Sequence, residues 1–215
     1  LRRKVYRPGA ILAARGGAPA ILGRALDAAA WAPVAASGLG GAAPRRDERV
    51  ETVSGFGPEF DAAWEAAGPS VAFAQTRDSA FLTWRYREMP LTRYETLALR
   101  RNGRLAGYAV LAVQDAPGGR VGRIADVFAY GGAVRDHALL LAAADRRFRD
   151  TDCAFAEISH AGGGALDVAA RRTGFLLRKD APPLVIRHDD PALNAKLPRL
   201  IERIHFCRGD HDEDY

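Results

Sequence analysis

The stretch from residue 94 to 114, YETLALRRNGRLAGYAVLAVQ, constrains the fold of this chain more than any other. Two runs rich in apolar and β-branched residues flank Asn102-Gly103, a dipeptide that readily adopts the left-handed backbone dihedrals of a tight type I′ turn. The first run alternates in character, whereas the second is almost wholly apolar, as expected for a strand inside a sheet covered on both faces. The sequence therefore predicts a β-hairpin within such a sheet.

The rest of the chain reads as additions to this hairpin. A Pro-Gly-Gly turn leads into a further strand at 120–130, which would extend the hairpin into an antiparallel meander. Apolar runs predict more strands at 153–159, 175–179 and 184–188. Helical periodicity and end signals predict helices at 21–31, 58–67, 79–89, 134–150, 165–173 and 192–206.

Composition divides the chain into three parts. Residues 1–50 are rich in Ala, Gly and Arg and end in a linker, residues 51–190 form the main domain, and residues 191–215 form a C-terminal helix and an acidic tail. The linker string GLGGAA matches a dinucleotide-binding fingerprint only formally, because no strand precedes it and no helix follows it. The chain begins at Leu1 without an initiator Met, so we expect further sequence upstream.

Charge and cysteine content exclude several classes of protein. The formal net charge is +5, but the arginines are dispersed along the chain, which does not indicate a nucleic-acid-binding surface. The two cysteines lie far apart in dissimilar contexts, so we expect no disulfide framework and a reducing cytoplasm. Charged residues interrupt the apolar run at 11–34, so no membrane span or signal peptide is expected.

Residues 56–188 resemble the GNAT (N-acetyltransferase) superfamily in the order of their predicted elements. The string ALDVAARRTGFLLRKDAPPLVIR resembles the last helix, the Gly-Phe turn and the two final strands of that family. RDSAFLTWRYREMP and the ending IHFCRGDHDEDY resemble GNAT-like proteins associated with polysaccharide synthesis, some of which carry two GNAT-type halves in tandem. The resemblance implies an α/β (α+β) fold with a mixed, mostly antiparallel central sheet flanked by helices.

The resemblance also implies transfer of an acyl group from acyl-CoA to an amine, for which a base must deprotonate the amine. Glu157, Asp126 and His160 are the candidates, because each lies on or just after a central strand. Glu157 ranks first, since it follows the strand whose separation from its neighbour opens the substrate cleft in GNAT folds. The alternatives are that Glu157 faces solvent or pairs with an arginine, that Asp126 pairs with Arg123, and that His160 is a loop residue.

GNAT enzymes commonly use a tyrosine to protonate the leaving thiolate. By the family pattern it precedes the Gly-Phe glycine by four residues, where this chain has Ala170. Tyr130, at the end of the third strand of the meander, is the nearest phenol in sequence and is the candidate. The alternative is a packed residue with its hydroxyl at the surface.

The cofactor loop of the family follows the pattern Arg/Gln-x-x-Gly-x-Gly/Ala and places backbone N–H groups at a helix N-terminus around the pyrophosphate. Here residues 133–138 take that register, and only Ala138 matches. Asp136 would lie beside the phosphates, with Arg135 in partial compensation, and a register shifted to the preceding glycines remains open. The residues implied to bind acetyl-CoA or another acyl-CoA are Val127, Ala129, Gly131, Gly132, Arg135, His137 and Ala138.

The tail holds a group of metal-binding residue types: His205, Cys207, Asp210, His211, Asp212 and Asp214. Soft and hard ligands are mixed and the spacing matches neither a zinc nor a calcium pattern, so we expect a flexible acidic tail and no metal site.

Three functions remain as hypotheses, and the weakest is an Arg-rich adaptor for anionic polymers, whose binding salt would abolish. In the first, the chain is a GNAT-like N-acyltransferase domain that uses acyl-CoA and an amine or amino-sugar acceptor. In the second, it is a catalytically silent GNAT-like half that supports a sister domain upstream or forms a binding surface. The degenerate cofactor loop and the absence of the family tyrosine favour the second hypothesis.

Overall fold

The structure is a computed structural model that describes residues 1–16, 19–39, 43–88, 91–161, 164–178, 189–200 and 203–210. Its helices are α1 (Pro8–Ala14), α2 (Ala20–Leu39), α3 (Pro58–Ala67), α4 (Ser79–Tyr86), α5 (Val134–Asp150), α6 (Gly164–Arg172) and α7 (Pro191–Leu200), with 3₁₀ turns η1 (Gly68–Ser70) and η3 (Arg208–Asp210). Its strands are β1 (Arg2–Val5), β2 (Glu48–Val53), β3 (Tyr94–Arg101), β4 (Arg104–Ala116), β5 (Gly119–Ala129), β6 (Cys153–Ile158), β7 (His160–Ala161), β8 (Leu176–Leu177) and β9 (Phe206–Cys207).

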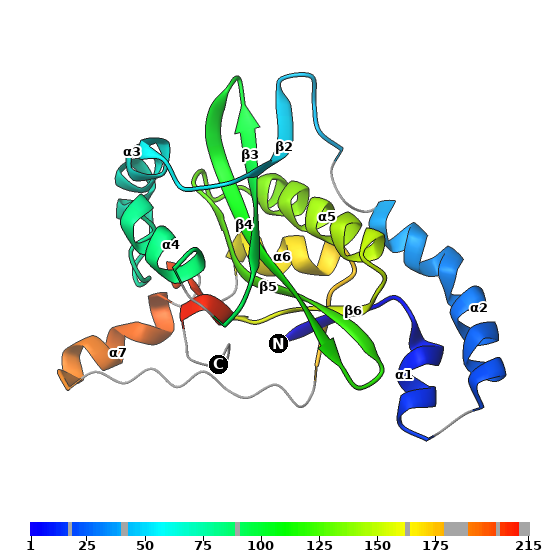
Figure 1. The fold of residues 1–215 in the computed structure, drawn as a ribbon. Helices are drawn as coiled ribbons and strands as arrows, with labels where there is room; N and C mark the ends of the chain where they lie inside the picture. Colours follow the sequence, from blue (N-terminus) through cyan, green and yellow to red (C-terminus); the bar gives the residue numbers. More distant parts are fainter. Residues whose placement is uncertain are drawn as a thin grey trace.

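The main sheet of the described residues has seven strands in the order β2-β3-β4-β5-β6-β1-β8. Every neighbouring pair is antiparallel except β5 and β6, which are parallel because α5 connects them as a crossover. Helices lie on both faces of this sheet (Figure 1). The expected fold class, a mixed and mostly antiparallel sheet flanked by helices, is confirmed.

The hairpin of β3 and β4 turns at Asn102-Gly103 as predicted. Both residues have positive φ, 49° for Asn102 and 77° for Gly103, which is the backbone conformation that a type I′ turn requires. Asn tolerates this conformation and Gly adopts it without strain, so the local sequence is sufficient to specify the turn.

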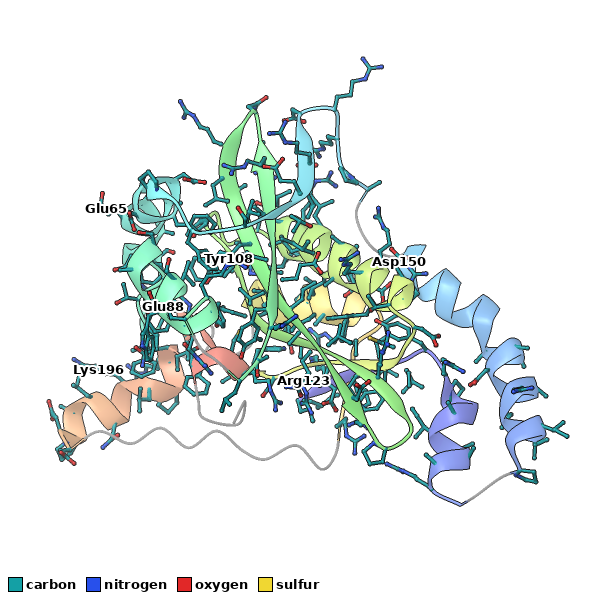
Figure 2. The ribbon with its side chains drawn as sticks, viewed as in Figure 1. Glu65, Glu88, Tyr108, Arg123, Asp150 and Lys196 are labelled. Carbon is teal, nitrogen blue, oxygen red and sulfur yellow. The ribbon has the colours of Figure 1, made fainter. Side chains whose placement is uncertain are left out.

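Two apolar cores lie on opposite faces of the sheet. Leu97, Leu99 and Ile124 pack beneath α5 and α6 in one core. Tyr108 and Phe128 belong to the other, which is rich in aromatic residues and includes residues of α3 and α4. Figure 2 shows Tyr108 on the side of the sheet that α3 and α4 cover. Side chains that alternate along β3, β4 and β5 therefore give the sheet two apolar faces, one packed against α5 and α6 and the other against α3 and α4.

The N-terminal residues form part of the main sheet. β1 pairs antiparallel with β6 on one side and with β8 on the other. Lys4 of β1 is buried, and its ammonium lies 2.9 Å from a carboxylate oxygen of Asp145 on α5. The hydroxyl of Tyr6, which follows β1, donates to the same oxygen at 2.9 Å. The expected domain boundaries stay a prediction, but the sheet itself extends across the boundary near residue 50.

The C-terminal region differs from the helix predicted at 192–206. α7 covers Pro191–Leu200, whereas Phe206–Cys207 is the short strand β9, which pairs with β7. The helical pattern was misleading there because backbone pairing with distant segments outweighs local propensity. The strand predicted at 175–179 is the two-residue β8, and the one predicted at 184–188 lies outside the described residues.

No helix in the described ranges combines the length and apolar character needed to cross a membrane.

Gly122 on β5 provides a test of the packing beneath α5. A Cβ added at this position would overlap the ring of Phe148, which is fully buried in the core on that face. We expect Gly122→Ala to lower the free energy of unfolding by about 1–3 kcal/mol through overpacking. Gly55→Ala is the control, because a Cβ there meets no atom within 4 Å, and urea denaturation measures both. Equal stability of the two variants would contradict the packing described for β5 and α5.

Candidate functional site

The parallel pairing of β5 with β6 ends before β5 itself ends. The last paired residues are Ile124 and Ile158, and β5 then continues through residues 125–129 with no partner on β6. A bulge at Ala125 interrupts the pairing of β5 with β4 at the same point, because Val110 faces Asp126 while Leu111 faces Ile124. We call the β6 side of residues 125–129 the splay.

The C-terminal segment, residues 203–210, fills the splay. On one side it bonds to the loop before α4, where Ala72 N donates to Arg203 O at 2.8 Å and His205 N donates to Phe73 O at 2.9 Å. On the other side, β9 pairs with β7 just after β6. The end of this segment, drawn in red in Figure 1, lies against β5. The C-terminal segment thereby joins the loop before α4 to β7.

Side chains of the C-terminal segment occupy the space next to β5. The His205 ring packs edge-to-face on Phe128, with ring centroids 4.8 Å apart. The thiol of Cys207, which is buried, lies against the backbone N–H of Val127. Among the residues that the structure describes, side chains of the C-terminal segment therefore lie within the splay.

A buried ion cluster joins this segment to β5. Arg77 is 0% exposed, and its guanidinium lies 3.3 Å from Asp126 Oδ2 and 2.6 Å from Asp210 Oδ2. The Tyr108 hydroxyl donates to Asp126 Oδ2 at 2.7 Å. Burial alone would raise the pKa of Asp126, but the charge of Arg77 and hydrogen bonds with His205 and Tyr108 outweigh it and lower that pKa below its usual range. Asp126 is therefore a carboxylate held in a structural ion pair.

Gly209 allows the segment to approach α4. A Cβ at this position would overlap the hydroxyl of Tyr86, and the Arg85 side chain donates from Nε to Gly209 O at 2.7 Å. The glycine of the Arg-Gly-Asp string is thus required by close packing.

Cys207, His205 and Asp126 lie together but lack the geometry of a nucleophilic triad. His205 Nε2 lies 3.1 Å from Asp126 Oδ1 and 3.7 Å from Cys207 Sγ, so the acid and the thiol share one ring nitrogen. A triad needs them on opposite nitrogens, so that the acid orients the ring while the other nitrogen takes the proton. Burial and the charge of Asp126 also raise the pKa of Cys207 well above its ordinary value. The cluster therefore holds a neutral thiol, which is a poor nucleophile.

Glu157, the first-ranked candidate base, lies in a different set of contacts. Its Oε1 accepts from Arg3 Nε at 2.7 Å, and its Oε2 lies 3.4 Å from Arg123 Nη1. The register places Glu157 opposite Arg123, before the splay begins. Glu157 and Asp126 thus belong to separate ion pairs in the described residues, and the catalytic role of each remains a prediction.

Tyr130 packs against the aromatic residues of the α3 and α4 face. Its ring centroid lies 5.3 Å from that of Phe128 and 6.1 Å from that of Tyr108. Burial raises the pKa of Tyr130, and the charge of Asp126 raises it further. Within the described ranges its hydroxyl is buried and has no hydrogen-bond partner. His160, whose pKa burial lowers to about 4, lies on β7 beside the C-terminal segment.

The residues expected to bind a cofactor lie at the end of β5 and the start of α5. Arg135 Nη2 lies 2.7 Å from Glu48 Oε2, and Arg101 Nη2 lies 2.5 Å from Asp136 Oδ1, so each charge at this helix terminus has an opposite partner. His137 Nδ1 lies 3.0 Å from Ala133 O, and burial lowers the pKa of His137 to about 4. The others, Val127, Ala129, Gly131, Gly132 and Ala138, lie on β5, in the turn or in the core, and their cofactor role is untested.

Sequence reasoning overlooked Arg77, the residue that unites the cluster. Nothing in the string QTRDSAF marks this arginine as buried, since most arginines are exposed. His205, Cys207 and Asp210 were noticed as a mixed ligand group, but their partner Asp126 lies far away in the chain. Only long-range contacts bring the four together.

No protein-family model matches this chain, and no curated protein matches it either. This chain is similar to a solved structure of a GCN5-related N-acetyltransferase from Anabaena variabilis, with 11% sequence identity and a TM-score of 0.42. The matched region covers 53% of this chain and 28% of that chain. The chain thus spans less than a third of the length of that protein. Identity this low carries neither activity nor substrate from one protein to the other.

Arg77 provides a test of the buried cluster. Arg77→Met leaves Asp126 and Asp210 buried without the cation that contacts both, and we expect a loss of about 3–5 kcal/mol in the free energy of unfolding. Arg46→Met is the control, because Arg46 is exposed, and we expect a change within about 0.5 kcal/mol. Chemical denaturation measures both variants. A loss below about 1 kcal/mol for Arg77→Met would show that the cluster contributes little.

Glu48 predicts a pH dependence. Hydrogen bonds from Arg135, supported by Arg101, lower the pKa of Glu48 from 4.5 to about 2. Because the folded-state pKa lies below the unfolded one, these contacts stabilise fully above about pH 4.5 and are lost as the pH falls toward about 2. The difference in free energy of unfolding between the wild type and Glu48→Gln should therefore shrink below about pH 4.5. Denaturation from about pH 7 to about pH 3 measures it. Glu65→Gln is the control, because it removes one carboxylate from an exposed position.

Proposed function

We propose that this chain is a catalytically silent GNAT-like half that supports a neighbouring domain rather than an acyltransferase in its own right. The observation that carries the proposal is the closed splay, in which the C-terminal segment occupies the space beside residues 125–129. Acyl transfer on a GNAT-like sheet needs that space for the thioester and needs a free strand amide to polarise its carbonyl. Here Cys207 of the C-terminal segment lies against the Val127 amide.

Charge pairing at the start of α5 supports the same conclusion. A helix N-terminus attracts phosphate when its first-turn amides and nearby cations are available. Asp136 places a carboxylate in that first turn, and the nearby cations Arg101 and Arg135 are engaged with Asp136 and Glu48. An incoming pyrophosphate would have to compete with two carboxylates, which weakens its binding.

Exposed apolar residues on the α1 and α2 pair support an interaction role. Ile21 is 83% exposed, Leu22 54% and Leu12 43%. These side chains belong to two helices that contact each other, and their exposed apolar area is available for contact with another protein surface. In this proposal the partner is an upstream sister domain, which would cover these helices.

The competing function is N-acyl transfer from acyl-CoA to an amine or amino-sugar acceptor in the cytoplasm. The parallel pair β5 and β6, which separates after Ile124 and Ile158, favours it. In that case Glu157 would act as the base, with Tyr130 or Asp126 assisting, and acyl-CoA would bind along β5 and the start of α5. The C-terminal segment would first have to leave the splay.

Calorimetric titration of the chain with acetyl-CoA distinguishes the two functions. We expect no binding at millimolar cofactor, because the splay is filled and the charges at α5 are paired. Binding with a dissociation constant tighter than about 1 mM, which is about 4 kcal/mol, would overturn the proposal in favour of acyl transfer. Loss of that binding in Arg135→Ala would then assign the cofactor to the start of α5. Release of free CoA thiol when acetyl-CoA and a primary amine are both present would also overturn the proposal in favour of acyl transfer.

A further inference from the structure

We propose that Asp126, His205 and Cys207 form a zinc site that holds the C-terminal segment against β5. The inference does not depend on the proposed function, because the three side chains would bind a metal ion whether or not the chain transfers acyl groups.

The ligand atoms lie at distances suited to one metal ion. Asp126 Oδ1, His205 Nε2 and Cys207 Sγ all lie within 4.8 Å of one another, and all three residues are buried. His205 Nε2 lies 3.1 Å from Asp126 Oδ1 and 3.7 Å from Cys207 Sγ. Zinc bound at about 2.0–2.3 Å in tetrahedral geometry separates its ligand atoms by about 3.3–3.8 Å. Small side-chain movements therefore suffice to form the site.

Convergence on one nitrogen distinguishes this group from an ordinary hydrogen-bond network. His205 Nε2 carries at most one proton, which can serve Asp126 or Cys207 well but not both. A metal ion among the three atoms would satisfy them together. The chemistry also favours zinc over magnesium or calcium, since imidazole and thiolate are borderline and soft ligands whereas the two hard cations prefer oxygen.

The remaining contacts of the ligands leave this position available. Arg77 and Tyr108 both engage Asp126 through Oδ2, whereas Oδ1 is the oxygen that faces His205. The Val127 N–H lies beside the Cys207 sulfur. Outer contacts of this kind orient metal ligands and stabilise a thiolate.

The charges of the cluster are consistent with a bound dication. Asp126 and Asp210 are two carboxylates in contact with one guanidinium, that of Arg77, which leaves one negative charge among these three buried groups. When zinc binds, the Cys207 thiol releases its proton to solvent and becomes a thiolate. Two positive charges and one negative charge are then added, and the cluster becomes neutral.

The site would fasten the end of the chain to the sheet. Asp126 lies on β5, whereas His205 and Cys207 belong to the C-terminal segment, so one ion would join elements that are 79 positions apart in sequence. Three protein ligands leave the fourth tetrahedral position to a further donor. Since the site is buried, we expect the ion to be bound as the chain folds.

Metal analysis of the full chain, prepared without a histidine tag, tests the proposal. When the chain is expressed and purified in the presence of Zn²⁺ and then dialysed, we expect about one zinc ion per chain by mass spectrometry. Co²⁺ in place of zinc should give a near-ultraviolet thiolate-to-metal charge-transfer band and visible bands typical of tetrahedral coordination. Cys207→Ser should remove the charge-transfer band and weaken Co²⁺ binding by more than about 10-fold, the loss that even outer contacts produce.

Cys153→Ser is the matched control. Cys153 is the other buried cysteine and is the first residue of β6. Its sulfur contacts Thr151 and lies apart from the cluster. This variant should retain both the zinc and the charge-transfer band. His205→Asn gives a second test should Cys207→Ser fail to fold, and it should weaken Co²⁺ binding similarly. Wild-type protein that retains no zinc, or a charge-transfer band that persists in Cys207→Ser, would overturn the proposal. The acetyl-CoA titration reports separately on the proposed function.

Discussion

The buried guanidinium of Arg77 is the constraint on which the arrangement of this protein depends. A charge with no exposed surface is tolerated only when opposite charges and hydrogen bonds surround it, since removal from water is otherwise prohibitive. Asp126 on β5 and Asp210 in the C-terminal segment provide those charges. Three distant parts of the chain must therefore come together before this buried charge is stabilised.

The same cluster holds the C-terminal segment against β5. The bulge at Ala125 turns Asp126 toward the aromatic core, where it pairs with Arg77 and accepts from Tyr108. A carboxylate neutralised in this way is a weak base, because the ion pair that lowers its pKa also lowers its affinity for a proton. Asp126, which the sequence offered as a candidate base, connects the C-terminal segment to β5 through its contacts with Arg77 and His205. A zinc ion on the opposite oxygen of Asp126 would strengthen the same connection.

Elements governed by local rules could be predicted from the sequence. Asn102-Gly103 specified its turn because only residues that tolerate positive φ fit a type I′ hairpin. α5 followed from its periodic apolar residues and from the arginines near its C-terminus, which suit the helix dipole. The end of the chain was misjudged, since a helical pattern at 192–206 gave way to a strand at Phe206–Cys207. The strand β1 was overlooked because four residues with three charges do not resemble a core strand.

The candidate site, too, could be predicted from the sequence only in part. Residue types, the hairpin, the helices and the general class of fold follow from short-range spacing, because turns, caps and amphipathic faces are formed by neighbours in the chain. Which carboxylate meets which arginine, and whether the space beside β5 is open or filled, depends on contacts between segments far apart in sequence. Loop closure and burial energetics select those contacts, and no local pattern encodes them. Asp126, His205 and Cys207 therefore became one site only when the C-terminal segment folded back across the sheet.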